Sequence, residues 1–166
     1  MPLGKRVLFI GAESSGKTTI AEECAQRVAG TTWVPEYGRE MWDKREGKLL
    51  YEDMVHIGLV QVAQEEAAMR THALVFCDTS PLVTKFYSNK LFGSVDAQLS
   101  ILAQREYDYV FWCTRDFGYV EDGTRNGVEF GTEQELFYKE NLGNITVLTG
   151  NVDQRFNTIR RVLQLT

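Results

Sequence analysis

Residues 11–19 read Gly11-Ala12-Glu13-Ser14-Ser15-Gly16-Lys17-Thr18-Thr19, and this stretch decides the fold. It has the complete form G-x-x-x-x-G-K-[ST] of a phosphate-binding loop, or P-loop. The apolar run Val7–Ile10 before it is typical of a buried parallel strand, and Thr18–Val28 after it has the spacing of an amphipathic helix. A chance match in a glycine-rich turn would lack these neighbours. The stretch therefore predicts a site for a nucleoside triphosphate.

The residue types of the P-loop suit a bound polyphosphate. Two glycines permit a close backbone approach that a Cβ atom would block. The loop N–H groups and the positive end of the following helix then face the phosphates. Lys17 is expected to reach the outer phosphates, and the Thr18 hydroxyl to ligate Mg²⁺, so ATP and Mg²⁺ are the expected cofactors. The loop residues expected to contact the nucleotide are Gly11, Glu13, Ser14, Ser15, Gly16, Lys17, Thr18 and Thr19.

Length and charge favour one domain that acts on small molecules. The chain has 166 residues, of which 43% are hydrophobic and 25% charged. The net charge of −5 argues against general binding to nucleic acid or an anionic membrane, because there is no basic excess to neutralise phosphates. We expect residues 1–166 to form a single domain whose partner is a small-molecule nucleoside acceptor.

Cysteine usage and the N-terminus predict a cytoplasmic protein. Cys24, Cys77 and Cys113 lie far apart in apolar stretches and lack metal-ligand spacing, which is typical of buried, reduced thiols. Met1–Arg6 leads directly into the first strand, so we expect no signal peptide. No apolar run approaches the length that spans a membrane.

Five short apolar runs recur along the chain with helical stretches between them. They are Arg6–Ile10, Thr31–Val34, Ala73–Cys77, Tyr109–Cys113 and Ile145–Leu148. Strands that alternate with helices imply β-α-β crossovers and a parallel sheet covered on both faces. Tyr51–Arg70 and Gln154–Leu163 have clear helical spacing. The sequence predicts an α/β fold of three layers, namely a P-loop NTPase fold with a five-stranded parallel sheet flanked by helices.

Charged residues follow the second and third predicted strands. Ligands of open α/β sheets bind beyond the carboxyl ends of the strands. Glu36 would face the γ-phosphate there and deprotonate a substrate hydroxyl, with Arg39 as its partner or as a phosphate ligand. The alternative is that Glu36 caps the next helix or is a solvated loop carboxylate. Asp78, at the tip of a buried strand, is placed to hold Mg²⁺; the alternative is a structural carboxylate that Thr79 and Ser80 satisfy.

The segments after the fourth and fifth strands suit the nucleotide side of the site. Arg115–Gly127 combines glycines with charges, which predicts a lid over about residues 115–135. Arg125, and next Arg115, would stabilise charge on the transferring phosphoryl group, although an ordinary surface loop has the same composition. Asn151 and Arg155 are expected to pack against the adenine.

The signals of a GTPase are missing. Asn89-Lys90 is followed by Leu91-Phe92 and does not complete N-K-x-D, and Asp78 is followed by Thr79-Ser80-Pro81 and does not form D-x-x-G. With the small size of the chain, this favours a small-molecule kinase.

Together these motifs resemble the ribosylnicotinamide kinase domain of the NadR family. The resemblance covers nearly the whole chain and implies ATP-dependent phosphorylation of nicotinamide riboside at its 5′-hydroxyl, giving nicotinamide mononucleotide in NAD salvage. The matching stretches are GAESSGKTT at the P-loop, EYGRE at Glu36–Glu40, FCDT at Phe76–Thr79, the form D-x-x-[aromatic]-x-x-D-G-x-R over Asp116–Arg125, and GNVDQRF at Gly150–Phe156.

The resemblance also implies roles for single residues. Glu36 would contact the ribose or act as the base, and Asp78 would serve both the metal and the substrate hydroxyls. Aromatic side chains would stack on the cationic pyridinium ring. The expected catalytic residues are Lys17, Glu36, Asp78 and Arg125; the expected substrate-binding residues are Glu36, Tyr37, Arg39, Trp42, Asp78 and Tyr87; and the expected metal ligands are Thr18 and Asp78.

Two other functions fit the same motifs. A kinase for another nucleoside or nucleotide would share the P-loop, the acid after the second strand and the arginine lid. A nucleotide-dependent switch or accessory ATPase would hydrolyse ATP without a small acceptor and would bind a protein partner. Glu36 and Arg125 favour an acceptor site over such a switch.

Overall fold

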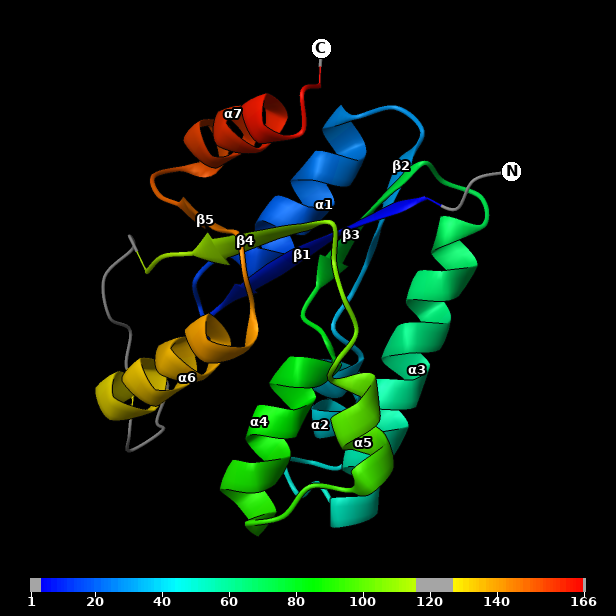
Figure 1. The fold of residues 1–166 in the computed structure, drawn as a ribbon, viewed down its shortest axis with the longest axis vertical. Helices are drawn as coiled ribbons and strands as arrows, with labels where there is room; N and C mark the ends of the chain where they lie inside the picture. The colour runs from blue at the N-terminus through cyan, green and yellow to red at the C-terminus, as the bar shows by residue number, and fades with distance from the viewer. Residues whose placement is uncertain (1–3, 116–126, 166) are drawn as a thin grey trace.

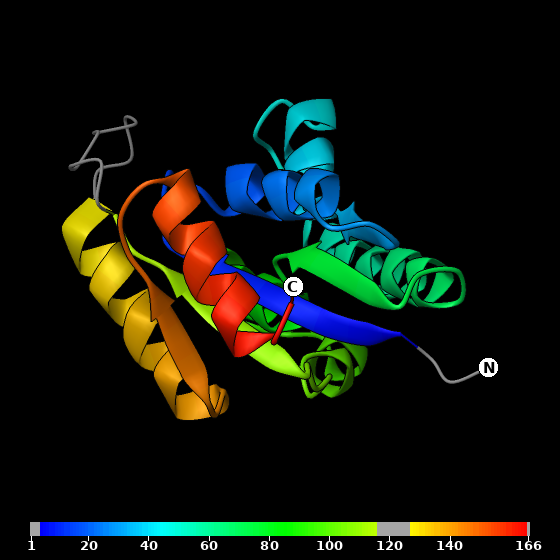
Figure 2. The same ribbon diagram turned by 90° about the horizontal axis from the view of Figure 1, so that it is seen from above.

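Five parallel strands form one sheet, and helices cover both of its faces (Figures 1 and 2). The computed structural model describes residues 4–115 and 127–165, and for residues 127–130 it describes the backbone alone. The strands are β1 (Lys5–Gly11), β2 (Thr31–Val34), β3 (Leu74–Asp78), β4 (Tyr109–Cys113) and β5 (Ile145–Leu148). The helices are α1 (Lys17–Arg27), α2 (Tyr37–Lys44), α3 (Tyr51–Met69), α4 (Pro81–Phe92), α5 (Ala97–Leu102), α6 (Gly127–Asn141) and α7 (Val152–Val162).

The order of the strands is β2-β3-β1-β4-β5, which confirms the predicted five-stranded parallel sheet. All five predicted strands occur, and their ends differ from the prediction by at most one residue. On the central strand, Phe9 pairs with Asp78 of β3 and with Phe111 of β4. Because all neighbours are parallel, every strand ends at the same edge, and the chain leaves β1 in the middle of that edge.

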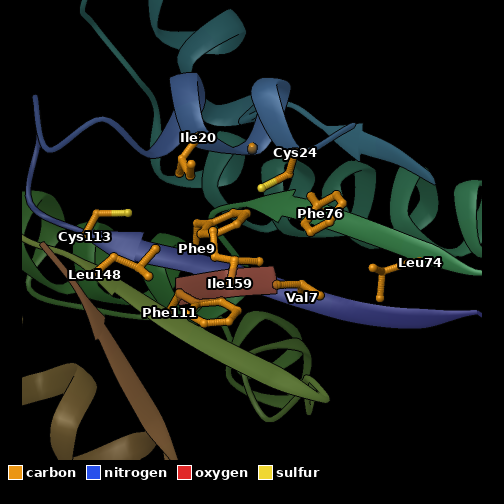
Figure 3. Close-up of a cluster of buried hydrophobic side chains, with 11 residues drawn as sticks. Val7, Phe9, Ile20, Cys24, Leu74, Phe76, Phe111, Cys113, Leu148 and Ile159 are labelled. Atoms are coloured by element: carbon orange, nitrogen blue, oxygen red, sulfur yellow. The ribbon is translucent and has the colours of Figure 1, made fainter. Parts of the chain in front are cut away.

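One face of the sheet is covered by α1 and α7. Val7 and Phe9 point to this face from β1 and are fully buried. The Phe9 ring stacks between the rings of Phe76 and Phe111, with centroid distances of 6.0 and 5.8 Å. Figure 3 shows this cluster with Ile159 of α7 packed onto it. A stack of three rings therefore joins the three central strands.

The other face of the sheet packs against α3, α4 and α6. Leu8 and Ile10 alternate with the residues of the first face and are equally buried, as expected for a parallel strand covered on both sides. They contact Leu82 and Phe86 of α4 and Tyr138 of α6. Among the helices that the structure describes, none combines the length and the apolar character that a bilayer crossing requires.

Replacing Phe9 with alanine should lower the free energy of unfolding by about 3–5 kcal/mol, because the lost ring leaves a cavity inside the stack. Urea denaturation followed by circular dichroism measures the change. Val147→Ala on β5 is the matched control, since that side chain is 55% exposed, and it should change stability by less than about 0.5 kcal/mol. Equal losses in the two variants would contradict the central role of the ring stack.

Candidate active site

The P-loop connects β1 to α1 and lies against the end of β4. A Cβ atom on Gly11 would come within 2.6 Å of the Cys113 carbonyl oxygen, so only glycine fits at this point. Gly16 is the N-cap of α1 with φ at +88°, a left-handed angle that glycine adopts without strain. Ser15 is fully buried. The exposed residues of the loop and the first helical turn are Glu13, Ser14, Thr18 and Thr19.

Lys17 keeps its ammonium group within the P-loop. Its Nζ atom donates to the carbonyl oxygens of Gly11 and Ala12, both at 3.0 Å. A positive charge thus sits where the loop N–H groups and the N-terminus of α1 converge, which favours an anionic ligand.

Asp78 and Thr18 bring two oxygen ligands together at the end of β3. The Thr18 hydroxyl donates to Asp78 Oδ2 at 2.5 Å. Asp78 is 1% exposed, and within the described chain its Oδ1 atom has no hydrogen-bond partner. Burial raises the pKa of Asp78, while the bond from Thr18 and the charge of Lys17 oppose this rise.

These two side chains fit a Mg²⁺ ion, which prefers hard oxygen ligands. The unpartnered Oδ1 atom of Asp78 has lost its hydration without gaining a donor, and a cation would compensate for that loss. The described residues contain no group of three or more His, Cys, Asp or Glu side chains that could hold a metal. The remaining ligands would therefore be nucleotide phosphate oxygens and water.

Thr79 and Ser80 do not satisfy the Asp78 carboxylate. Both are buried, and in the described part of the chain their hydroxyl oxygens have no hydrogen-bond partner. Thr79 also has φ at +76°, which is rare for a β-branched residue and costs about 1–3 kcal/mol. Backbone strain and buried hydroxyls that lack partners in the described part of the chain mark these two positions beside the P-loop as unusual.

Glu36 carries a carboxylate that makes no hydrogen bond or ion pair to any described residue. It is the N-cap residue of α2, with φ and ψ of −70° and 105°, yet its side chain does not cap the helix. Burial raises the pKa of Glu36; the positive charges of Lys17 and Arg39 oppose the rise, and the negative charges of Asp78 and Glu13 add to it. The Glu36 carboxylate is thus within electrostatic range of both Lys17 and Asp78.

A buried glutamine of α3 fixes the start of α2. Gln61 is 1% exposed, and its Oε1 atom accepts the backbone N–H of Tyr37 at 3.0 Å. This bond holds the residue that directly follows Glu36. The Tyr37 ring packs edge-on against His56, and its hydroxyl lies 3.3 Å from His56 Nε2. Gln61 was not among the predicted site residues. The feature of the sequence that could have identified it is a polar residue at an apolar position of the helix, four residues after Ile57.

Arg39 and Trp42 lie on the exposed side of α2. The positive charge of Arg39 opposes the rise in the pKa of Glu36 that burial causes. Trp42 is 43% exposed, and its indole packs over Gly47, where an added Cβ atom would be 3.3 Å from the ring.

Tyr87 on α4 bridges the P-loop and α6. Its hydroxyl donates to Glu13 Oε1 at 3.3 Å and accepts a bond from Gln134 Nε2 at 3.4 Å. Gln134, which the sequence analysis also missed, is 2% exposed and donates to the Tyr138 hydroxyl at 3.0 Å. Burial raises the pKa of Tyr87, and the charges of Glu13 and Glu36 add to the rise. Of the three aromatic candidates, Tyr87 is the one whose hydroxyl has a hydrogen bond to a P-loop residue within the described part of the chain.

The predicted lid is described only in part. Arg115 follows β4, and its guanidinium lies over α6, since a Cβ atom on Gly131 would be 3.5 Å from Nη2. Arg125 lies outside the described residues, as does the rest of 116–126. From Gly127 onward the predicted segment belongs to α6.

The two residues expected at the adenine have different surroundings. Asn151 is exposed at the start of α7, where its side chain accepts the Gln154 N–H at 2.9 Å and caps the helix. Arg155 is buried, and its guanidinium donates to backbone carbonyl oxygens of three loops.

The chain belongs to the AAA domain family, whose model matches residues 6–145 and thus more than half of the chain. No curated protein sequence matches it. Among solved structures, NadR in complex with nicotinamide riboside matches with 22% identity and a TM-score of 0.68. NadR in complex with NAD and AMP-PNP matches with 20% identity and a TM-score of 0.73. Both alignments cover 99% of this chain but only 52% and 51% of the NadR chains, so this chain spans about half their length.

The same fold occurs in a deoxyadenosine kinase from M. mycoides with the products dCMP and dCDP bound. That structure matches with 15% identity and a TM-score of 0.64, over 96% of this chain and 98% of the kinase. At these identities the likeness to the solved structures establishes a shared fold.

Asp78→Asn should weaken the effect of Mg²⁺ on nucleotide binding by about 10-fold or more, because the charge that compensates the ion is lost while the side chain keeps its shape. Titration of a fluorescent ATP analogue with Mg²⁺ and with EDTA measures the effect. Glu22→Gln is the control, since it removes one exposed carboxylate from α1. An unchanged Mg²⁺ effect in Asp78→Asn would contradict the assignment.

Proposed function

We propose that the chain is an ATP-dependent kinase that phosphorylates the 5′-hydroxyl of nicotinamide riboside and gives nicotinamide mononucleotide. The observation that carries this proposal is the Glu36 carboxylate. It has no hydrogen bond or ion pair to the described residues, and yet it lies within electrostatic range of Lys17 and Asp78. An acceptor kinase needs a carboxylate beside its P-loop, because a substrate hydroxyl must be oriented and deprotonated there. This requirement supports an acceptor kinase over a nucleotide-dependent switch.

In this mechanism Glu36 accepts the proton of the substrate hydroxyl. The hydroxyl oxygen donates an electron pair to the γ-phosphorus. The bond from the γ-phosphorus to the bridging oxygen breaks, and its electrons leave with ADP. Lys17 offsets negative charge on the transferring group and on the leaving phosphate.

Thr18 and Asp78 are the residues that would hold Mg²⁺ with the nucleotide. The ion would neutralise part of the polyphosphate charge. Asp78 would then serve a second purpose, because its Oδ2 atom accepts the Thr18 O–H and leaves the lone pairs of that hydroxyl oxygen available to the ion.

A cationic acceptor suits the charges around this site. Glu13, Glu36 and Asp78 place negative charge near Tyr87, whose ring could stack on a pyridinium group. The stretches EYGRE and FCDT resemble the NadR family at the positions of Glu36 and Asp78. A NadR structure of the same fold is a complex with nicotinamide riboside, which supports this choice of acceptor.

A lid over about residues 115–135 completes the proposal. Arg125, and next Arg115, supply positive charge to the transferring phosphoryl group. Gln134 of α6 donates to Tyr87, and Tyr87 donates to the P-loop residue Glu13, so α6 is linked to the nucleotide loop through Tyr87 of α4.

A kinase for another nucleoside or nucleotide is the second candidate. The observation that favours it is the shared fold with deoxyadenosine kinase and with the thymidylate kinases of Candida albicans and Ehrlichia chaffeensis. The two candidate functions differ in the acceptor and share the same type of reaction, which is phosphoryl transfer.

An ATP-to-ADP turnover assay with Mg²⁺ decides between the candidates. We expect turnover that depends on nicotinamide riboside, with formation of the mononucleotide detected by mass spectrometry. Dependence on a different nucleoside would retain the kinase and replace the acceptor. ATP hydrolysis that is indifferent to every acceptor would reject the kinase in favour of a nucleotide-dependent switch.

Glu36→Gln should lower kcat by about 10²–10⁴-fold, since an amide cannot accept the proton. The wild-type kcat/KM should also fall as the pH drops through the Glu36 pKa, which burial places above the ordinary value of about 4.3. This fall of kcat/KM at low pH should be absent in Glu36→Gln. Glu40 is exposed in the helix that follows Glu36, and Glu40→Gln should retain both the wild-type kcat and the fall at low pH. A loss of less than about 10-fold would reduce Glu36 to a positioning role.

A further inference from the structure

We propose that Arg155 is a positioning residue that sets the orientation of the P-loop backbone and thereby the affinity for the nucleotide. The proposal rests on the proposed use of the loop as a triphosphate site, and it is independent of the identity of the acceptor. It assigns the Arg155 side chain to the loop backbone, in place of the adenine contact expected from the sequence.

The guanidinium of Arg155 joins three loops at the carboxyl edge of the sheet. Its Nη1 atom donates to the Ser15 carbonyl oxygen in the P-loop at 2.6 Å. Its Nη2 atom donates to the carbonyl oxygen of Thr114 after β4 at 2.7 Å, and its Nε atom donates to the carbonyl oxygen of Gly150 after β5 at 3.0 Å. The side chain is 2% exposed and is among the largest fully enclosed side chains of the described chain. One planar fork therefore fixes the P-loop to both neighbouring loops.

Helix α7 holds this fork rigidly. The helix begins with a capping box. The Asn151 side chain accepts the backbone N–H of Gln154, and the Gln154 side chain accepts the backbone N–H of Asn151. Ile159 follows Arg155 by four residues, lies on the same side of the helix and is fully buried against the sheet (Figure 3). The guanidinium is thus carried by a helix whose position the hydrophobic core determines.

The bond to Ser15 has a direct consequence for the phosphate site. In a planar trans peptide the C=O and the following N–H point in opposite directions. Because the Ser15 carbonyl oxygen turns inward to Arg155, the N–H of Gly16 turns away from the interior. Gly16 is the N-cap of α1, so this N–H belongs to the group that faces a bound phosphate.

The positive charge of Arg155 acts on the same site. Burial raises the pKa of Cys113 to about 11, and Arg155 is the strongest of the groups that oppose this rise, with Lys17 second. Cys113 lies against the P-loop, since an added Cβ atom on Gly11 would be 3.4 Å from its Cβ atom. A charge that reaches this thiol from beneath the loop also favours an anion above it.

Three variants test the proposal by titration with a fluorescent ATP analogue and Mg²⁺. Arg155→Lys keeps the charge but loses the fork, and it should bind about 10-fold more weakly; Arg155→Met loses both and should bind about 100-fold more weakly. Arg160→Met, an exposed arginine on the same helix, should remain within about twofold of the wild type. Circular dichroism and the thermal midpoint establish that each variant is folded at the titration temperature.

Chemical rescue separates positioning from simple loss of stability. Methylguanidinium at millimolar concentration should restore ATP binding to Arg155→Ala and leave Lys17→Ala unchanged. If Arg155→Met or Arg155→Ala does not fold, Arg155→Lys still decides the question. A folded Arg155→Lys variant with wild-type ATP affinity overturns the inference. A wild-type chain that fails to bind ATP at all would instead overturn the proposed function.

Discussion

The parallel pairing of β1 with β3 and β4 is the constraint on which the rest of the structure depends. The strand is buried on both faces, so its register is set by two hydrophobic clusters at once. That register places Phe9 opposite Asp78, and the chain leaves β1 for the P-loop two residues later. Thr18, at the start of α1, can then reach Asp78 across the edge of the sheet. The site is therefore a consequence of strand register rather than of any single loop.

The edge that results holds an excess of buried negative charge. Burial raises the pKa values of Glu36 and Asp78, and each of these carboxylates is only partly compensated by Lys17. Such an arrangement lowers the stability of the chain. The cost of these buried carboxylates falls when a divalent cation accompanies the nucleotide and when a proton is delivered to Glu36. These charges support the proposed binding of a metal-nucleotide complex together with a proton-donating acceptor.

Local patterns predicted the fold, because strands and the P-loop are recognisable from neighbouring residues. The rule that ligands bind beyond strand ends also located Glu36 and Asp78 correctly with respect to the sheet. The contacts that support the site escaped prediction for a physical reason, although Arg155 itself was an expected site residue. The bond from Arg155 to Ser15 spans 140 positions of sequence, and that from Tyr37 to Gln61 spans 24. Such contacts depend on how helices pack on the sheet, which no local spacing encodes.

The two halves of the site have separate supports. The acceptor side is held by α3, where Gln61 fixes the start of α2 and Glu65, one turn later, is fully buried with Arg105 at 2.9 Å. The nucleotide side is held by α7 through Arg155. These supports lie on opposite faces of the sheet. Changes in α3 should therefore act on the acceptor and its deprotonation, whereas changes in α7 should act on the affinity for the nucleotide.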